Sequence, residues 1–223
     1  MISKLPGWVW VGAAILAFSA GMINVIAILG FVHKGITHVT GNSSLLSIAI
    51  LEGDSKNIAQ LFSIIGSFFA GSIFAGIIIG DARLRMGRRY GFALAIESIL
   101  LLVSTYGFTR GLIYGEYFAS AAAGLQNAMA STYSEAIVRT THMTGILTDI
   151  GALIGNKIRR IKIDEKRIRL LSIIFFSFLS GGLLGAFCYR RLGALAMLVP
   201  TAIIGASSIG YEIFRRKVAK PVV

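Results

Sequence analysis

The chain has 223 residues, of which 55% are hydrophobic and only 14% are charged. A soluble domain carries about 25% charged residues, so this composition excludes a soluble enzyme, a secreted disulfide scaffold and a disordered tail. The net charge of +12 does not indicate nucleic-acid binding, because the basic residues flank apolar stretches, where they set membrane topology. The single cysteine, Cys188, excludes an intramolecular disulfide and a cysteine-based metal cluster.

Long uncharged stretches define the predicted membrane spans. Five stretches of 18 or more residues contain no Asp, Glu, Lys or Arg: 7–32, 57–80, 117–134, 170–189 and 192–211. Stretches of this length are typical of membrane-spanning helices. Together with a weaker stretch they predict six full-length helices, at about 8–32, 57–80, 90–109, 115–135, 170–189 and 192–213. The first is too long for a signal-peptide core, so we expect it to be retained.

Two shorter apolar segments, residues 35–51 and 140–156, either cross the membrane or enter it and return. If both cross, the Lys and Arg residues divide 14 to 8 between the two sides, and if neither crosses they divide 17 to 5. Cytoplasmic loops collect Lys and Arg, so the sharper division is favoured. The sequence therefore predicts an all-α integral protein of the inner (cell) membrane with six transmembrane helices, two short broken or re-entrant helices, and both termini in the cytoplasm.

The two halves of the chain resemble each other. Four motifs recur in the same order: Ala20-Gly21-Met22-Ile23-Asn24 with Ala123-Gly124-Leu125-Gln126-Asn127, Thr37-His38-Val39-Thr40-Gly41 with Thr141-His142-Met143-Thr144-Gly145, Gly76…Gly80 with Gly181…Gly185, and Arg85-Met86-Gly87 with Arg191-Leu192-Gly193. Each half then holds span, insertion, span, span. Because three crossings are an odd number, the halves, 1–112 and 113–223, must point in opposite directions and form one membrane domain. Such inverted-topology repeats are common in transporters and channels.

The second half carries a longer distinctive run. Gly124-Leu125-Gln126-Asn127-Ala128 is followed by Arg139-Thr140-Thr141-His142-Met143-Thr144-Gly145-Ile146-Leu147-Thr148-Asp149, and the first half contains His38-Val39-Thr40-Gly41-Asn42. These motifs resemble the signatures of the YoaK-like membrane proteins, a bacterial family of unknown function and about this length. Met143 stands where many relatives have Val. The resemblance implies a multi-pass helical inner-membrane protein and implies no substrate or reaction.

The repeated Thr-His motif is the candidate site. We expect Gly41 and Gly145 to break the chain before short helices, with Thr40, Asn42 and Thr144 as helix N-caps. The positive dipole ends of the two helices would then favour an anion or a polar neutral solute near the midplane. The alternative is that the motif only caps and locks buried helices.

The two motif histidines, His38 and His142, are expected to approach each other across a pseudo-twofold axis. Neither a third His nor a Cys is matched by the repeat, so we predict neither a metal site nor a cofactor. A hydrogen bond to the backbone or to a Thr, and a proton-linked role, both stay open.

Asp149 is the strongest functional candidate among the acidic residues, because an acid inside a membrane segment is energetically costly and is a functional candidate by default. We expect it to face the protein interior or a cavity. The alternative is that it pairs with Arg139 or with a helix end. Glu97 also lies within a predicted span, either as a buried acid or paired with a loop arginine.

Three amides lie within predicted spans, Asn24, Gln126 and Asn127. They either line the cavity or form interhelical hydrogen bonds. The glycine pairs Gly76/Gly80, Gly151/Gly155 and Gly181/Gly185 are spaced for close helix packing.

The sequence contains no nucleotide-binding or catalytic motif. The predicted function is a secondary transporter or channel for a small polar or anionic solute, passive or ion-coupled, and not an enzyme. The alternatives are a membrane-embedded enzyme or redox or lipid-binding protein, and a non-catalytic membrane scaffold. A polar path between the insertions would favour the first, a lateral apolar pocket the second, and a filled centre the third.

The predicted partners are the bilayer and anionic lipid at the basic loop 157–169, with a homo-oligomer left open.

Overall fold

The computed structural model describes residues 6–30, 35–80, 87–134 and 138–218, and over these residues the chain is helical with no β-strand. The elements are α1 (Gly7–Leu29), α2 (Val39–Glu52), α3 (Ser55–Ile79), α4 (Arg88–Thr109), α5 (Tyr114–Tyr133), α6 (Met143–Ile158), α7 (Glu165–Leu192), a 3₁₀ turn η2 (Gly193–Met197) and α8 (Leu198–Val218). The predicted all-α class is confirmed.

Four stretches of the described chain are long and apolar enough to cross a membrane. They are α1, α3, α4 and the stretch Glu165–Lys217, which contains both α7 and α8. α5 is a predicted span that is absent from this set. Its sequence is rich in Ala, Gly and Ser, and more than half of its residues are buried, so it lies inside the bundle.

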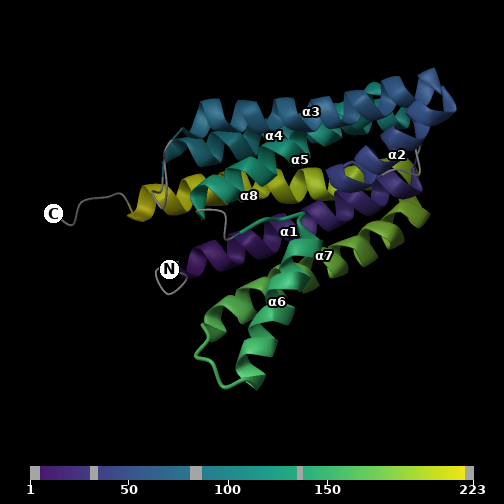
Figure 1. Cartoon of the computed structure of the whole chain (residues 1–223). Helices are drawn as coiled ribbons and strands as arrows, with labels where there is room; N and C mark the ends of the chain where they lie inside the picture. Colours follow the sequence, from purple (N-terminus) through teal and green to yellow (C-terminus); the bar gives the residue numbers. More distant parts are fainter. Residues whose placement is uncertain (1–5, 31–34, 81–86, 135–137, 219–223) are drawn as a thin grey trace.

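The six long helices run alongside one another, and α1 begins at the same end of the bundle at which α8 ends (Figure 1). α1 packs along α7, and α3 packs along α5. α4 packs against both α5 and α8, while α8 makes only a small contact with α1. The small contact between α1 and α8 leaves a gap between their side chains.

Glycines allow the paired helices to touch backbone to backbone. A Cβ on Gly21 of α1 would lie 2.0 Å from the carbonyl oxygen of Phe178, and one on Gly181 of α7 would lie 2.0 Å from that of Phe18. The α3–α5 pair has the same contacts: a Cβ on Gly124 or Gly71 would lie 2.0 Å from the carbonyl oxygen of Phe68 or Ala121, respectively. No larger residue fits at these four positions without separating the helices.

The predicted glycine spacings are correct for one pair only. Gly181 and Gly185 both pack against the α1 backbone. In contrast, Gly76, Gly151 and Gly155 have open space where a side chain would be. Spacing alone does not show which face of a helix meets a neighbour, so the other two pairs were wrongly assigned to packing.

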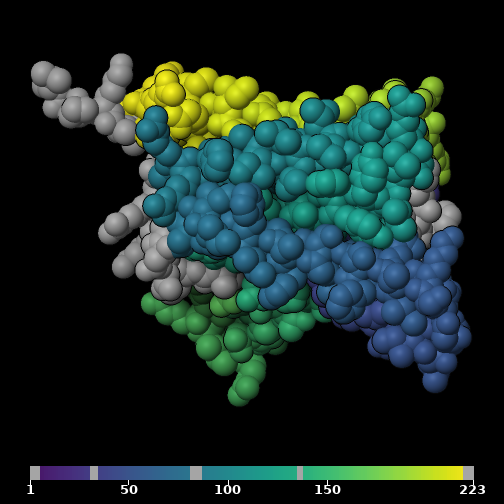
Figure 2. Space-filling model, turned by 90° about the horizontal axis from the view of Figure 1, so that it is seen from above, coloured from purple at the N-terminus to yellow at the C-terminus, as the bar shows by residue number. Residues whose placement is uncertain are grey.

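The two short helices project from the bundle at opposite ends (Figure 2). α2 has 14 residues and α6 has 16. At 1.5 Å per residue, each is too short to cross a hydrocarbon core of about 30 Å.

The beginnings of α2 and α6 differ from the prediction. The helices start at Val39 and Met143, with His38 and His142 as N-caps, so Thr40, Asn42 and Thr144 are not N-caps. Gly41 and Gly145 lie in the first helical turns and neither has a positive φ, so they are not helix breaks.

The outer faces of the long helices are apolar. Phe62, Phe69 and Ile77 on α3, and Phe176 and Leu183 on α7, are each more than half exposed. Large contiguous apolar surfaces are unstable in water. These faces therefore suit contact with lipid.

Candidate solute-binding cavity

A polar cavity of ≈ 630 Å³ lies where the first turns of α2 and α6 meet the long helices. It is lined by both Thr-His motifs and by residues of α1, α3, α5 and α7: Asn24, Thr37, His38, Val39, Thr40, Gly41, Phe68, Asn127, Ala128, Ser131, Arg139, Thr141, His142, Met143, Thr144 and Phe178. Phe68 and Phe178 are near the middle of α3 and α7, so the cavity lies about halfway along the bundle.

Each motif histidine folds back over the glycine three residues later. A Cβ on Gly41 would lie 2.3 Å from Cε1 of His38, and a Cβ on Gly145 would lie 2.3 Å from Cε1 of His142. Glycine is therefore needed to leave room for an imidazole ring, which explains the motif without a break in the helix.

Two asparagines hold the segments that lead into the short helices. The Asn24 Oδ1 of α1 accepts a hydrogen bond of 2.8 Å from the Thr37 hydroxyl. On α5, the Asn127 Oδ1 accepts one of 3.1 Å from the Thr140 hydroxyl, and its Nδ2 donates to Thr141 Oγ1. Both asparagines thus line the cavity, and their hydrogen bonds hold the segments before α2 and α6 and do not join two helices.

Arg139 brings a positive charge into the cavity. Its Nη1 lies 3.3 Å from Nδ1 of His142. Arginine has only donors, so Nδ1 is the acceptor in this hydrogen bond. None of the described residues that line the cavity is acidic.

Sequence reasoning treated Arg139 only as a partner for an acid and did not include it in the site. A signal was present, because Arg139 stands three residues before His142 within the run that carries the family resemblance.

The first turns of α2 and α6 add to this positive potential. Neither His38 nor His142 makes a side-chain capping hydrogen bond, so the N-cap side chain supplies no acceptor for the first N–H groups of either helix. Such groups and the helix dipole attract anions. Thr40 and Thr144 lie exposed in these turns and add hydroxyl groups to the cavity wall.

Two predicted site residues serve packing instead. Asn42 is buried, and its Nδ2 donates a 2.8 Å hydrogen bond to the carbonyl oxygen of Gly35. Gln126 is buried, and its Nε2 donates a 2.9 Å hydrogen bond to the carbonyl oxygen of Leu16, which ties α5 to α1. Neither residue lines the cavity.

Asp149 lies outside the cavity. Its Oδ2 accepts a 2.8 Å hydrogen bond from Nη2 of Arg167, and this ion pair joins α6 to the start of α7. Both side chains are about half exposed, at 47% for Asp149 and 46% for Arg167. The partner of Asp149 is thus Arg167 and not Arg139, which lines the cavity.

Glu97 is fully buried in α4, and neither carboxyl oxygen has a hydrogen-bond partner among the described residues. Burial without a partner favours the neutral acid, because an unpaired charge is costly in an apolar interior. Of the two alternatives, the structure therefore favours a buried acid over an arginine pair.

Within the described ranges, no group of three or more His, Cys, Asp or Glu residues is placed to bind a metal ion.

Comparisons with known proteins give two matches. A family model described as "Protein of unknown function (DUF1275)" matches residues 12–210. The chain is also similar to the UPF0700 transmembrane protein YoaK of Bacillus subtilis (strain 168), with 25% identity over 173 residues that cover 73% of this chain and 77% of the relative. No solved structure matches the chain. The predicted YoaK-like resemblance is confirmed, and with it the multi-pass membrane character.

Proposed function

The chain belongs to the DUF1275 family of membrane proteins of unknown function, and we propose that it is a secondary transporter or channel for a small anion or anionic metabolite. The observation that carries this proposal is the polar cavity halfway along the bundle, which Arg139 and both Thr-His motifs line. Cavities of this size that contain a few convergent polar groups are typical of small-molecule sites.

We propose six crossings of the inner membrane, with both termini in the cytoplasm and α2 and α6 as re-entrant helices. The halves, 1–112 and 113–223, form an inverted repeat under this proposal. Two observations support it: α1 packs on α7 as α5 packs on α3, and the four glycine contacts of these pairs are equivalent. The counterpart of Gly181 is then Gly71 and not Gly76, because only Gly71 makes the corresponding backbone contact.

The charge of the cavity favours an anion over a cation. It combines a guanidinium, two helix N-termini and several hydroxyl groups, and none of its described lining residues is acidic. A desolvated cation would face the guanidinium and two positive dipole ends, whereas an anion would be stabilised by all three.

The backbone around the cavity also suits a solute pathway. Residues 35–38 before α2 and residues 138–142 before α6 are not helical. Non-helical backbone at membrane depth is tolerated only inside protein or beside a water-filled cavity. Without a nucleotide-binding motif in the sequence, transport would be passive or ion-coupled.

Thermal unfolding of the purified protein with sodium salts of phosphate, sulfate, nitrate and acetate, at constant ionic strength, tests the proposal. At least one anion should raise the midpoint, since a ligand at 100 times its Kd adds about 2.7 kcal/mol to the unfolding free energy. Arg139→Gln should abolish this rise. Arg110→Gln is the matched control, because Arg110 stacks on Tyr106 and does not line the cavity.

The anion that stabilises the protein should then enter proteoliposomes that contain the wild type and not those that contain Arg139→Gln. The proposal is wrong if no anion of the panel stabilises the protein, or if Arg139→Gln and Arg110→Gln respond alike.

A further inference from the structure

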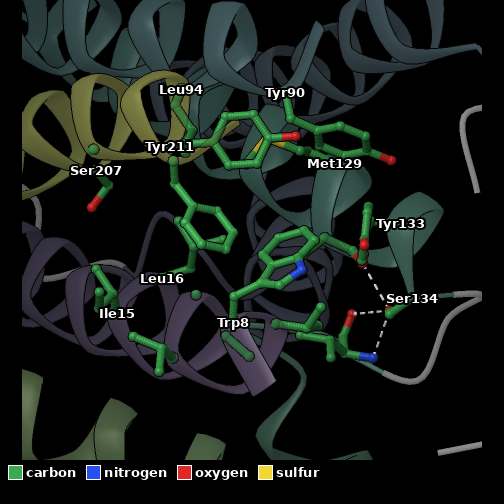
Figure 3. Close-up of a pocket in the computed structure, with 18 of the residues that line it drawn as sticks. Trp8, Ile15, Leu16, Tyr90, Leu94, Met129, Tyr133, Ser134, Ser207 and Tyr211 are labelled. Carbon is green, nitrogen blue, oxygen red and sulfur yellow. Dashed lines mark hydrogen bonds between the residues drawn. The ribbon is translucent and has the colours of Figure 1, made fainter. Parts of the chain in front are cut away.

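A second cavity, of ≈ 690 Å³, lies at the end of the bundle where α1 begins and α8 ends (Figure 3). Its walls come from α1, α4, α5 and α8 and are almost entirely apolar or aromatic. It occupies the gap that the small α1–α8 contact leaves. Val11 and Phe214 line it and are 60% and 41% exposed, so it opens sideways between α1 and α8 onto an apolar outer surface.

The cavity is aromatic at one end and aliphatic at the other. Trp8 and Tyr133 lie 5.0 Å apart between ring centroids, Tyr90 and Tyr133 lie 5.1 Å apart, and Trp8 and Tyr211 lie 6.0 Å apart. Leu16, eight residues after Trp8 on α1, lines the other end, about 12 Å along the helix at 1.5 Å per residue. Trp and Tyr are enriched at the membrane interface. The cavity therefore runs from interface level into one leaflet.

We infer that this cavity binds an acyl chain of an anionic phospholipid. Depth and shape agree with this occupant: the aliphatic end holds the chain, and the aromatic end lies at the interface. Basic residues follow on both neighbouring helices. Arg88 begins α4, and Arg215, Arg216 and Lys217 form the last turn of α8. Glu212 pairs with Arg215 and Arg216, so the group keeps a net positive charge that suits a negative headgroup. The inference is independent of the proposed transport function.

The chain offers a built-in reporter for this site, because its two tryptophans are Trp8, which lines the cavity, and Trp10, which does not. Trp10→Phe leaves Trp8 as the sole fluorophore. The variant is reconstituted in phosphatidylglycerol vesicles whose acyl chains carry bromine, which quenches tryptophan on contact. Trp8 should be quenched strongly.

A cavity-filling variant separates a bound chain from bulk lipid. A Cβ on Gly12, which lines the cavity, would meet no atom within 4 Å, so Gly12→Phe fills the cavity without a backbone clash. In the Trp10→Phe background it should remove most of the quenching. Gly76→Phe is the matched control, because Gly76 has equally open space but is on α3, outside the cavity. It should leave the quenching unchanged.

A second measurement tests the headgroup. Brominated phosphatidylcholine should quench Trp8 less than phosphatidylglycerol does. Equal quenching in Gly12→Phe and Gly76→Phe overturns the inference, and so does quenching by a brominated free fatty acid but not by the phospholipid.

Discussion

The glycines of the Thr-His motif have a steric role at the scale of single residues. Gly41 and Gly145 look like flexible breaks in the sequence, but each lies inside a helical turn, under the imidazole ring of the preceding histidine. In the second motif this position keeps His142 Nδ1 within 3.3 Å of Arg139. The absence of a side chain at each glycine thus leaves room for the histidine ring in the cavity wall.

Gly145→Ala should displace the His142 ring, because the new Cβ would lie 2.3 Å from ring carbon Cε1. Alanine favours the helix by up to about 1 kcal/mol over glycine, so the fold should persist. We expect the anion-induced rise in unfolding temperature to shrink or disappear while the anion-free midpoint changes little. Gly151→Ala on the same helix has open space and serves as the control. An unchanged anion response in Gly145→Ala would show that the ring position does not matter.

Small residues determine how the long helices pack at the scale of elements. α5 is the most enclosed of them, and its Ala, Gly and Ser residues allow α3 to approach to backbone contact. The same small residues lower its hydropathy, so α5 does not meet the criteria for a span that α1, α3 and α4 meet. High hydropathy therefore identifies the lipid-facing helices but does not identify α5, the helix at the centre of the bundle.

Gly181→Ala and Gly71→Ala should both destabilise the protein, each by about 1–3 kcal/mol, as expected for overpacking in a close contact. In each variant the added Cβ would lie 2.0 Å from a backbone oxygen of the facing helix, which cannot move away as a side chain could. Detergent-induced unfolding measures the change. If the α1–α7 and α3–α5 contacts are equivalent, the two losses should be similar.

Gly76→Ala is the control for both, since it has open space on α3 and should leave stability unchanged or slightly higher. A large loss in Gly76→Ala, or none in Gly181→Ala, would contradict this account of the packing.

At the scale of the whole molecule, two of its cavities have opposite character. The polar one lies halfway along the bundle, and the apolar one opens sideways at the end where α1 begins and α8 ends. The packing is symmetric along α1–α7 and α3–α5 but unequal elsewhere, because α4 packs firmly on α5 whereas α8 barely contacts α1. The apolar cavity lies where the contact between α1 and α8 is small. It shares no lining residue with the polar cavity, so the two proposed sites can be tested separately.

Topology reporters fused at Lys4 and after Lys220 should both report the cytoplasm. The reason is the 17 to 5 division of Lys and Arg under six crossings. A third reporter in the basic segment between α6 and α7 should report the same side. A periplasmic signal from either end would contradict the six-crossing topology, and so would one from the third position.

The sequence alone was sufficient for the helical class, the membrane character, the family and the motif pair that the cavity brings together. These follow from local quantities: the length of uncharged runs, and residue identities at fixed spacings. It also named Asn24, Asn127, His38 and His142 as site candidates, and the structure places all four in the wall of one cavity.

Only the tertiary structure decided which residue partners which. It paired Asp149 with Arg167, brought Arg139 into the cavity, and buried Asn42 and Gln126 in packing contacts. These outcomes depend on the rotation and depth of each helix relative to its neighbours. In a chain that is apolar on most faces, hydrophobic periodicity does not determine that rotation; close contacts at glycines such as Gly21 and Gly181 do.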